Sequence, residues 1–511
     1  MILVYMLADV LGRTSDGANT LGIATVILLW INPYNIVNSA FWMSFLAMSG
    51  IIFVKPLLSD DKSILIYVKR PDKKHITFKQ MIVFGLADSI ITGISITITT
   101  LPVMLVISGQ VPVISLFLNI IVIPLMSVIM MSGIFTGITG MFSIGAACFF
   151  AGAGGYILDF YNVLCKISSH FKYAVIVTGA PDNSRIVLYF MVLIVWVLVH
   201  VLLKNKRADT ICLGLLMLVM TGLHYDINAD MKAAMLDVGQ GDSIAVHTKD
   251  GLNVLFDGGS TTKKNVGRYT IYSYLKHCGV RKLDYVFVSH PDKDHINGIY
   301  ELIEMRDNTF EIGTVVLPEI RRTMAEKKQV DGDMSKLEKT LKAAGINVVY
   351  AVAGDCIKSG EFSVKCMHPC DGYDYESAND YSAVYLVEYG DFSMLMTGDA
   401  EKKTEKCIVE DVNRIAGDAD TSARLVSVNI LKVGHHGSKG ASSEEFLSYV
   451  KPETALISCG AGNSYGHPHT ETLKRLSGIK AKVYRTDESG EIAVRVREGS
   501  YKIEMFKKLK G

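Results

Sequence analysis

The order of apolar and polar positions divides the chain near residue 225. Before that point, long apolar runs recur with few charges between them. They lie at about 19–33, 40–54, 80–107, 111–130, 131–152, 187–203 and 209–224. Runs of this length can cross the roughly 30 Å hydrocarbon core of a bilayer as helices. The pattern predicts an all-α, polytopic membrane domain of about seven spans over 1–224; the runs 131–152 and 209–224 could instead be re-entrant.

Two basic loops predict the orientation of these spans. The segment 55–79 contains seven lysines and arginines, and 204–207 contains three. Basic loops stay in the cytoplasm. Four apolar runs separate the two loops, and an even number returns the chain to the same side. The last run then carries the chain outward, so 225–511 is predicted to be an extracytoplasmic domain.

Several polar and irregular features interrupt the membrane half. Asp88 and Asn119 lie in apolar runs, where they either line a pathway or make an interfacial or helix–helix contact. Pro102 and Pro124 are predicted to break or kink helices. The segment 153–186 mixes aromatic residues with lysines and is either an amphipathic surface helix or a plain loop with a helical piece.

After residue 225, short apolar runs alternate with amphipathic helical patterns. The predicted strands are 233–236, 242–248, 253–256, 285–289, 314–317, 348–352, 383–387, 393–396, 429–433 and 454–458. The predicted helices are 268–277, 296–305, 334–344, 443–450 and 470–477. Strands followed by helices indicate a layered α/β domain. Because polar motifs mostly follow the strands, their side chains are expected to gather at one edge.

The net charge and the cysteine spacing do not change this predicted division into two domains. The formal net charge is +1, so no strongly basic domain indicates a nucleic-acid partner, and any such surface must be local. The nine cysteines form no CxxC pair. Cys366 and Cys370 are either bridged, if the domain is extracellular, or two unrelated thiols.

The densest chemical signal is residues 290–295, which read His-Pro-Asp-Lys-Asp-His directly after an apolar run. Four metal-ligand side chains within six residues, at the end of a buried strand, predict a hydrolytic centre with Zn²⁺- or Mn²⁺-type chemistry. Lys293, in the middle of the cluster, either meets a phosphate or is simply solvated.

Further polar clusters follow other predicted strands. They are 237–243 (DVGQGDS), 256–259 (FDGG), 394–399 (MLMTGD), 431–438 (LKVGHHGS) and 463–469 (NSYGHPH). Each cluster alone is compatible with a routine turn, and a single histidine with a satisfied core or surface group. Six of the thirteen histidines fall in these motifs, however, which favours one shared site.

A two-metal site assigns roles to these residues. A carboxylate bridges the ions and a bound water becomes nucleophilic near neutral pH. The predicted metal ligands are His290, Asp292, Asp294, His295, Asp399 and His435, with Asp399 as the bridge and either His435 or His436 completing the second ion's shell. Asp294, Asp399 and His467 are the predicted catalytic residues, His467 as general acid or as a group that orients the leaving group. Supporting residues are predicted to be Asp237, Gln240, Asp242, Asp257, His436, Ser438 and Asn379.

These clusters resemble the metallo-β-lactamase superfamily, whose hallmark is an HxHxDH motif after a strand. Here Asp292 replaces the second histidine. The HxDxDH variant, together with DVGQGDS, TGD, VGHHGS and YGHP, looks like the C-terminal domain of the ComEC family over roughly 232–490. The membrane half is similar to the same family's competence domain, more loosely, at 16–21, 32–34, 100–102 and 119–124.

The resemblance implies a fold and a cofactor. It implies an αββα metallo-β-lactamase fold over 225–511 that holds two divalent ions, Mn²⁺ or Zn²⁺; the oxygen ligand Asp292 shifts the expectation toward Mn²⁺. The family usually has further spans and an OB-like domain before the point that Met1 matches, which implies an N-terminally truncated relative. The superfamily's third-motif histidine has no clear counterpart: His368 matches by position, and Asn379 or Ser382 could approach the site instead.

The function implied is DNA uptake in natural transformation. A membrane channel would pass single-stranded DNA, while the outer domain, a nuclease acting on double-stranded DNA, degrades the other strand. The implied partners are DNA, the cell membrane and other competence proteins. One alternative is a metallo-hydrolase of the same fold acting on another phosphoester; the other is a transport protein with a vestigial metal domain.

Overall fold

A computed structural model describes residues 10, 12, 16–59, 77–171, 173–225, 228–320, 331–370, 375–416 and 427–506. The chain divides into two compact units. The first comprises Met1–Asp226 with Lys276–Gly279, and the second comprises Ile227–Leu275 with Val280–Gly511.

The first unit is helical apart from one short ladder. Its elements are α2 (Gly17–Ile31), η1 (Pro33–Val37), α3 (Ser39–Ser49), η2 (Gly50–Val54), α4 (Lys55–Ser59), α5 (Phe78–Ser108), β1 (Gln110–Val111), α6 (Ser115–Gly140), α7 (Ile144–Ser169), β2 (Ile176–Val177), α8 (Asn183–Leu203) and α9 (Lys206–Thr221). Short polar residues begin several helices: the side chains of Asp16, Asn38 and Ser143 each accept a backbone N–H of the first turn of α2, α3 and α7. The apolar core of this unit surrounds Tyr189 and Trp196 of α8.

Five helical stretches in the described part of the first unit are long and apolar enough to cross a membrane. They are Ser39–Ser59, Val83–Ser108, Ser115–Gly140, Ile144–Ser169 and Asn183–Leu203. The protein is therefore a membrane-spanning one. The run 17–31 forms a shorter apolar helix, and the run near 209–224 forms the 16-residue α9.

Two predicted boundaries in this unit are wrong. The runs 111–130 and 131–152 become α6 and α7, because a turn after Gly140 and the Ser143 cap separate the helices ten residues later than predicted. The segment 153–186 is not one unit: α7 continues to Ser169, and α8 begins at Asn183. Four long apolar helices still lie between the two basic loops, although residues 60–76 of the first loop are outside the described residues.

The polar and proline residues of the membrane half each have a definite position. Pro102 lies inside α5 and Pro124 inside α6, so neither ends its helix. The carboxylate of Asp88 lies 2.9 Å from the ammonium of Lys55, which agrees with an ion-paired, structural role. Asn119 lines a largely apolar cavity of about 370 Å³ beside α5 and α6.

The second unit contains two mixed sheets. The eight-stranded sheet has the order β17-β16-β3-β4-β5-β6-β7-β8, and the seven-stranded sheet has the order β15-β14-β13-β12-β11-β10-β9. The first sheet comprises β3 (Met231–Met235), β4 (Ile244–Thr248), β5 (Asn253–Phe256), β6 (Lys282–Phe287), β7 (Glu311–Pro318), β8 (Asn347–Ala351), β16 (Ile492–Arg497) and β17 (Ser500–Met505). The second comprises β9 (Cys356–Ser359), β10 (Phe362–His368), β11 (Val384–Tyr389), β12 (Phe392–Met396), β13 (Ile430–Lys432), β14 (Thr454–Ile457) and β15 (Lys482–Arg485). Strands β5 to β8 run parallel, as do β12 to β15.

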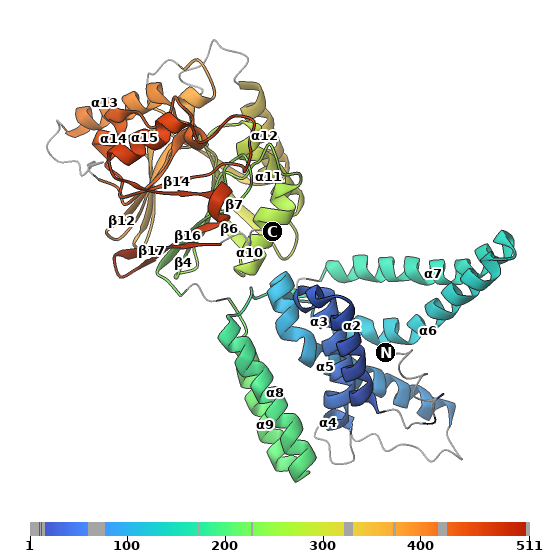
Figure 1. Cartoon of the computed structure of the whole chain (residues 1–511). Coiled ribbons are helices and arrows are strands. Elements are labelled where there is room, and N and C mark those ends of the chain that lie inside the picture. The colour runs from blue at the N-terminus through green and yellow to red at the C-terminus, as the bar shows by residue number, and fades with distance from the viewer. Residues whose placement is uncertain are drawn as a thin grey trace. The chain divides into compact units, whose positions relative to one another are not determined.

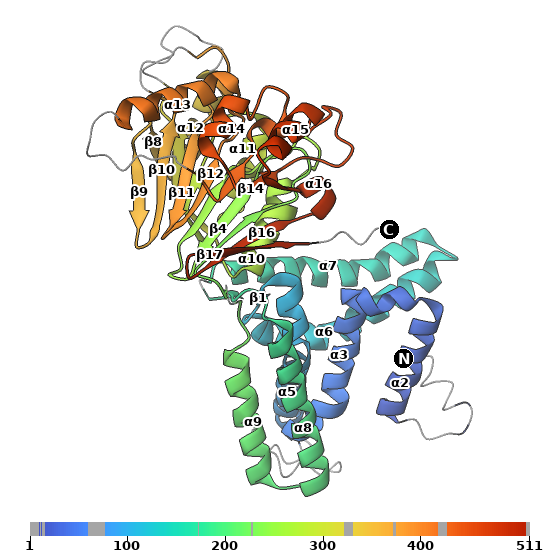
Figure 2. The ribbon, with the colours of Figure 1, turned by 60° about the vertical axis from the view of Figure 1, so that its left-hand side comes forward.

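The longer helices of this unit, α11 to α15, cover the outer faces of the two sheets (Figures 1 and 2). The described helical segments of the unit are η3 (Gly267–Ile271), α10 (Tyr272–His277), α11 (Lys293–Glu304), α12 (Asp331–Ala343), η4 (Asn379–Tyr381), α13 (Lys402–Ala416), η5 (Gly434–Gly437), α14 (Glu444–Val450), α15 (Thr470–Gly478) and α16 (Thr486–Ser489). The main core lies between the sheets, where Phe256 and Phe287 of one sheet meet Tyr385 of the other. A second core joins the seven-stranded sheet to α13, α14 and α15. The unit is an αββα sandwich, as predicted.

Each of the ten predicted strands overlaps an observed one, and 253–256 matches β5 in both bounds. The elements of this unit that were not predicted are the strands β9, β10, β15, β16 and β17, the helices α13 and α16, and the short segments η4 and η5. Most of these strands lie at or near a sheet edge, so their apolar signal is weak.

Candidate metal centre

The predicted clusters meet at one edge of the sandwich, where strands of both sheets end. The loop 288–292 follows β6, Asp399 follows β12, and the HHG turn follows β13. Because the carboxyl ends of parallel strands share an edge, residues far apart in the sequence converge there.

The HxDxDH segment changes direction at Asp292, which occupies the N-cap position of α11 with extended backbone. His290 therefore stays on the approach to the helix, while Asp294 and His295 lie in its first turn. Gly259 lies directly against this turn: a Cβ built on it would lie 2.3 Å from the backbone carbon of Asp294. Only glycine fits there, because no rotamer change relieves a contact with backbone.

Asp399 lies among four imidazoles. Its Oδ1 is 3.2 Å from Nε2 of His295 and 3.8 Å from Nε2 of His436. Its Oδ2 is 3.6 Å from Nε2 of His435 and 3.9 Å from Nε2 of His290. The two oxygens of one carboxylate therefore face two different groups of potential ligands.

The two groups each contain a further carboxylate. Asp292 Oδ2 lies 3.6 Å from Nε2 of His290. Asp294 Oδ2 lies 3.4 Å from Nε2 of His436. The trios His290–His295–Asp399 and Asp294–His295–His436 each have ligand atoms within 4.8 Å of one another, close enough to share an ion.

The donor atoms that face this space are buried without hydrogen bonds. Nε2 of His290, His295 and His436 and Oδ1 of Asp399 have no hydrogen-bond partner among the described residues. Buried polar atoms of this kind are rare and costly. Three imidazole nitrogens and carboxylate oxygens converging with their lone pairs unused are the donor set of a divalent metal centre, so the residues present fit such ions.

The opposite ring nitrogens are held by hydrogen bonds that orient the imidazoles. Nδ1 of His295 donates to Asp257 Oδ2 at 3.0 Å. Ser289 Oγ donates to the same carboxylate at 2.7 Å and accepts from Nδ1 of His290 at 3.0 Å. Nδ1 of His436 donates to the carbonyl of Ser458 at 2.9 Å. In the neutral form of each ring, this hydrogen bond leaves Nε2 with the lone pair that faces Asp399.

His435 and His436 differ sharply although they are neighbours. His436 has about 1% of its side chain exposed, whereas His435 has 27%. Both have left-handed backbone, with φ of 45° and 53°, which turns the two side chains apart. Nδ1 of His435 contacts Glu401 Oε1 at 2.7 Å, and Ser438 Oγ donates to the same oxygen at 2.9 Å.

The charges in the centre stabilise one another. Burial opposes the ionisation of Asp399, but the surrounding imidazoles, His295 first, hold the pKa of this carboxyl well below its usual range. Burial also disfavours the imidazolium form of His295, yet Asp399 and Asp257 raise its pKa well above the usual value. For His436, Asp399 and Asp242 outweigh burial and raise the pKa to about 9. Without metal, protons occupy the positions that cations would take.

Several predicted supporting residues lie in or next to this centre. The carboxylate of Asp242 is 3.6 Å from Nδ1 of His436. Gln240 Nε2 lies 3.3 Å from Nδ1 of His467. The His467 ring lies 5.5 Å from that of His435, and burial together with the two neighbouring imidazoles lowers its pKa to about 4.

Other sequence candidates lie outside the cluster of donor atoms. Asp237 pairs with Lys263 at 3.1 Å. The backbone carbonyl of Asn379 accepts a hydrogen bond from Thr404 of α13. Among the described contacts, none joins the side chain of Asn379 to the centre. His368 Nε2 donates to the carbonyl of Asp380 at 2.8 Å and is not among the donors around Asp399.

One residue of the site was not found from the sequence. Lys432 is 2% exposed; it contacts Asp242 and donates to the carbonyl of Gly398 at 2.7 Å. A single lysine inside an apolar strand carries no sequence signal for such a role. Ser382, which the sequence suggested could approach the site, accepts the backbone N–H of Asp399 at 2.9 Å.

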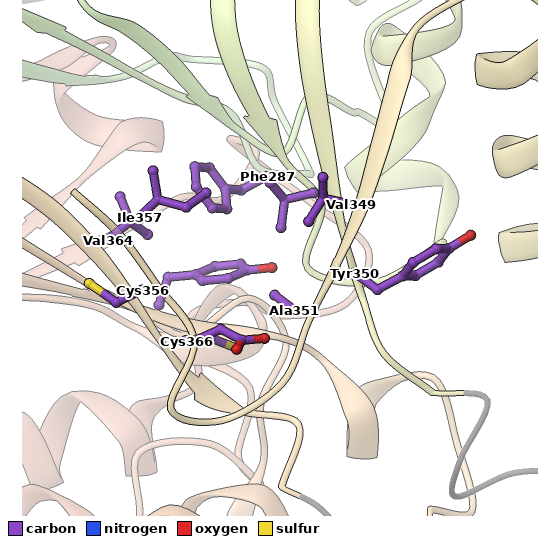
Figure 3. Close-up of a pocket in the computed structure, with 11 residues that line it drawn as sticks. Phe287, Val349, Tyr350, Ala351, Cys356, Ile357, Val364 and Cys366 are labelled. Atoms are coloured by element: carbon purple, nitrogen blue, oxygen red, sulfur yellow. The ribbon is translucent and has the colours of Figure 1, made fainter. Parts of the chain in front are cut away.

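One pocket between the sheets lies away from this centre. A cavity of about 280 Å³ lies near β8 and β9, lined mainly by apolar side chains such as Phe287, Val349, Ile357 and Val364 (Figure 3). None of the described ligand candidates lines it. Its position is that of a gap in the core, not of a chemical site.

Comparison with known proteins agrees with this architecture. Residues 236–345 match the family model for the metallo-β-lactamase superfamily, and residues 1–203 match the model for the competence protein family. Among solved structures, the chain matches the metallo-β-lactamase fold protein YhfI from Bacillus subtilis (12% identity, TM-score 0.32, 54% of this chain and 100% of that one). Another is CmlA, a diiron β-hydroxylase from Streptomyces venezuelae (12% identity, TM-score 0.34, 52% and 54%).

The second unit is therefore a metallo-β-lactamase-fold domain of the class that supports metal-dependent hydrolysis. Curated relatives include ComE operon protein 3 of Bacillus subtilis, 25% identical over 97% of this chain and 60% of the relative. Competence protein ComA of Neisseria gonorrhoeae is 28% identical over 53% of this chain and 33% of the relative. The chain thus carries a competence domain and a metallo-β-lactamase domain, and its homologues are proteins of the ComEC family. It spans 60% or less of the length of these relatives.

Proposed function

We propose that the second unit is a two-metal phosphodiesterase that cleaves DNA, and that the first unit is part of a membrane path for the surviving strand. The observation that carries the proposal is the carboxylate of Asp399, whose two oxygens face two separate groups of buried imidazole nitrogens. That arrangement matches a bridging ligand between two ions, the centre that stabilises both the attacking and the leaving oxygen in phosphodiester cleavage.

The ligand assignment divides the residues by the oxygen of Asp399 that they face. One ion would be held by His290, Asp292, His435 and Asp399 Oδ2. The other would be held by Asp294, His295, His436 and Asp399 Oδ1. Both histidines of the HHG turn would then be ligands, His435 of the first ion and His436 of the second. When bound, the ions supply Lewis acidity and an activated water.

The chain's own residues prepare this chemistry. Asp257 and Ser289 fix the orientation of His295 and His290, so their lone pairs need no reorganisation. His467 is a neutral imidazole at neutral pH, because its pKa is lowered to about 4, so it does not act there as an imidazolium general acid. Of its two predicted roles, orienting the leaving group is therefore the one that we assign, with Gln240 holding its ring.

The choice of DNA rests on the relatives. One of them is named Competence protein ComA, another ComE operon protein 3, and a third Recombination protein 2, from Haemophilus influenzae. The carboxylate ligands Asp292 and Asp294 favour Mn²⁺ over Zn²⁺, since oxygen-rich shells suit harder ions. Other competence proteins are the expected partners.

The location of the second unit is part of the same proposal. Four long apolar helices separate the two basic loops, so both loops can lie in the cytoplasm. The proposal then assigns the outward crossing to the 16-residue α9, which is shorter than the five candidate spans among the described residues. Protease added to intact protoplasts should cut the C-terminal unit of a functional, tagged chain. Protection of that unit until the membrane is lysed would place it in the cytoplasm.

The activity is tested with the full chain in detergent. With Mn²⁺ present, it should cleave double-stranded DNA, bind two ions per chain and lose both properties in Asp399→Ala. Asp391→Ala removes an exposed carboxylate before β12 and is the matched control, with activity expected to be unchanged. Full cleavage by the Asp399 variant would refute the mechanism. Activity only on another phosphoester, such as a cyclic nucleotide, would refute the substrate, and absence of bound metal would favour a vestigial domain.

A further inference from the structure

A second group of reactive side chains lies away from Asp399. His368 ends β10, Cys370 follows it by two residues, and Cys407 lies in α13. The two sulfur atoms are 2.7 Å apart, and Nδ1 of His368 is 3.5 Å from Sγ of Cys370. All three side chains are buried, with 2% or less of each residue exposed.

The sequence had left open a bridge between Cys366 and Cys370. The structure instead directs Sγ of Cys366 to the carbonyl of His368 at 3.1 Å. Cys370 meets Cys407, which is 37 positions further along the chain. This pair could not be recognised from spacing, because α13 itself was not predicted.

The sulfur–sulfur distance discriminates between two chemistries. Two thiolates on one tetrahedral Zn²⁺, each at about 2.3 Å, lie about 3.8 Å apart. Two bonded sulfurs lie about 2.05 Å apart. The observed 2.7 Å is closer to the bonded value.

We propose that Cys370 and Cys407 form a disulfide in the mature protein. The two thiols give up two protons and two electrons to a small-molecule or protein disulfide, which is reduced to two thiols as the new S–S bond forms. His368 is placed to assist: Nε2–H donates to Asp380 O, so the lone pair of Nδ1 faces Cys370 and can accept the thiol proton. Because both sulfurs are buried in the folded unit, the exchange takes place during folding.

The bond would fasten the start of α13, which follows the candidate bridging residue Asp399 closely in the sequence. Thr404 of α13 donates to the same Asp380 carbonyl, at 3.0 Å, that accepts from His368. Cys370, Asp380 and α13 therefore already form one contact group, and the disulfide would close it covalently. The proposal concerns the oxidation state of this group and does not depend on the reaction at the metal centre.

The test uses the full chain, expressed in its membrane and isolated without reductant. After thiol alkylation under denaturing conditions and digestion, a cross-linked peptide pair containing Cys370 and Cys407 should appear, lighter by two hydrogens than the separate peptides. Reduction should replace it by the separate peptides. Cys366→Ser should retain the link, because that thiol is not part of the pair.

Two results would overturn the proposal. One is recovery of Cys370 and Cys407 as separately alkylated peptides, even after the chain has been refolded with oxidised glutathione. The other is a bound zinc ion that is lost in Cys370→Ser and Cys407→Ser while the ions at Asp399 remain. If a cysteine variant fails to fold, the peptide analysis and the zinc content of the unaltered chain still test the proposal.

Discussion

Binding of metal to the centre around Asp399 should release protons, and His436 gives the effect a magnitude. Its Nδ1 is committed to the Ser458 carbonyl, so the proton that a cation must displace is on Nε2, which faces Asp294 and Asp399. Burial alone would remove that proton, but the carboxylates Asp399 and Asp242 raise the pKa to about 9.

Since pH 7 is about two pH units below the pKa of His436, the imidazole is protonated at pH 7. Because about half of the imidazole is still protonated at pH 9, displacing the proton lowers the apparent metal affinity at pH 7 about 50-fold, or about 2.3 kcal/mol, relative to pH 9. His295, whose pKa is also raised by Asp399 and Asp257, adds to the effect. The apparent affinity for Mn²⁺ should therefore rise at least about 50-fold between pH 7 and pH 9.

Titration calorimetry of the full chain with Mn²⁺ measures this directly. At pH 7, the observed heat should differ between buffers of different ionisation enthalpy, with at least one proton released per chain. His467→Gln is a suitable control, because a pKa of about 4 leaves that residue neutral at pH 7; its proton count should equal that of the unaltered chain. Equal affinity at pH 7 and pH 9 with no buffer-dependent heat would refute the reasoning.

Three further predictions concern stability and access to the centre. A folded-state pKa of about 9 for His436 means that its stabilising contribution in the metal-free protein is fully present below pH 6.5 and is lost as pH rises to 9. Thermal unfolding of the second unit should show a loss of about 3 kcal/mol over that range, and bound metal should abolish the dependence. Lys432→Met leaves Asp242 buried without its cation and should cost about 3–5 kcal/mol in denaturant unfolding; a loss below 1 kcal/mol would show that the pair is dispensable. Gly259→Ala should abolish Mn²⁺ binding by displacing the HxDxDH turn, whereas Gly332→Ala, which has open space around its Cβ, should leave binding unchanged.

The sequence identified the strands that carry the chemistry because they are short, central and apolar. The run before His290 is a buried parallel strand, and the polar cluster that follows it stands out against it. Strands β16 and β17 were not predicted, because their apolar residues alternate with charged ones such as Arg495 and Glu504. Such alternation suits a position near the sheet edge. The helix boundary at Ser143 was missed because glycine-rich apolar sequence continues on both sides of that cap.

The convergence of the site is a tertiary property. The HxDxDH and TGD motifs can be recognised from the sequence alone. How His435 and His436 each face the centre, however, depends on two left-handed backbone conformations and on Glu401. The role of Lys432 depends on a carboxylate 190 positions earlier in the chain. Spacing along the sequence contains neither relationship, since both arise only when the two sheets pack.

The strand order has a consequence for how the second unit is made. Strand β3, the first of this unit to be synthesised, pairs on one side with β4 and on the other with β16, from Met231 opposite Val496 to Met235 opposite Ile492. While the ribosome is still adding residues before Ile492, that side of β3 has no partner strand, and its backbone N–H and C=O groups are exposed to other chains. Folding of the unit can therefore be completed only at the end of translation. Loss of the last two strands by early termination would shorten the protein and would also leave an unpaired, aggregation-prone sheet edge.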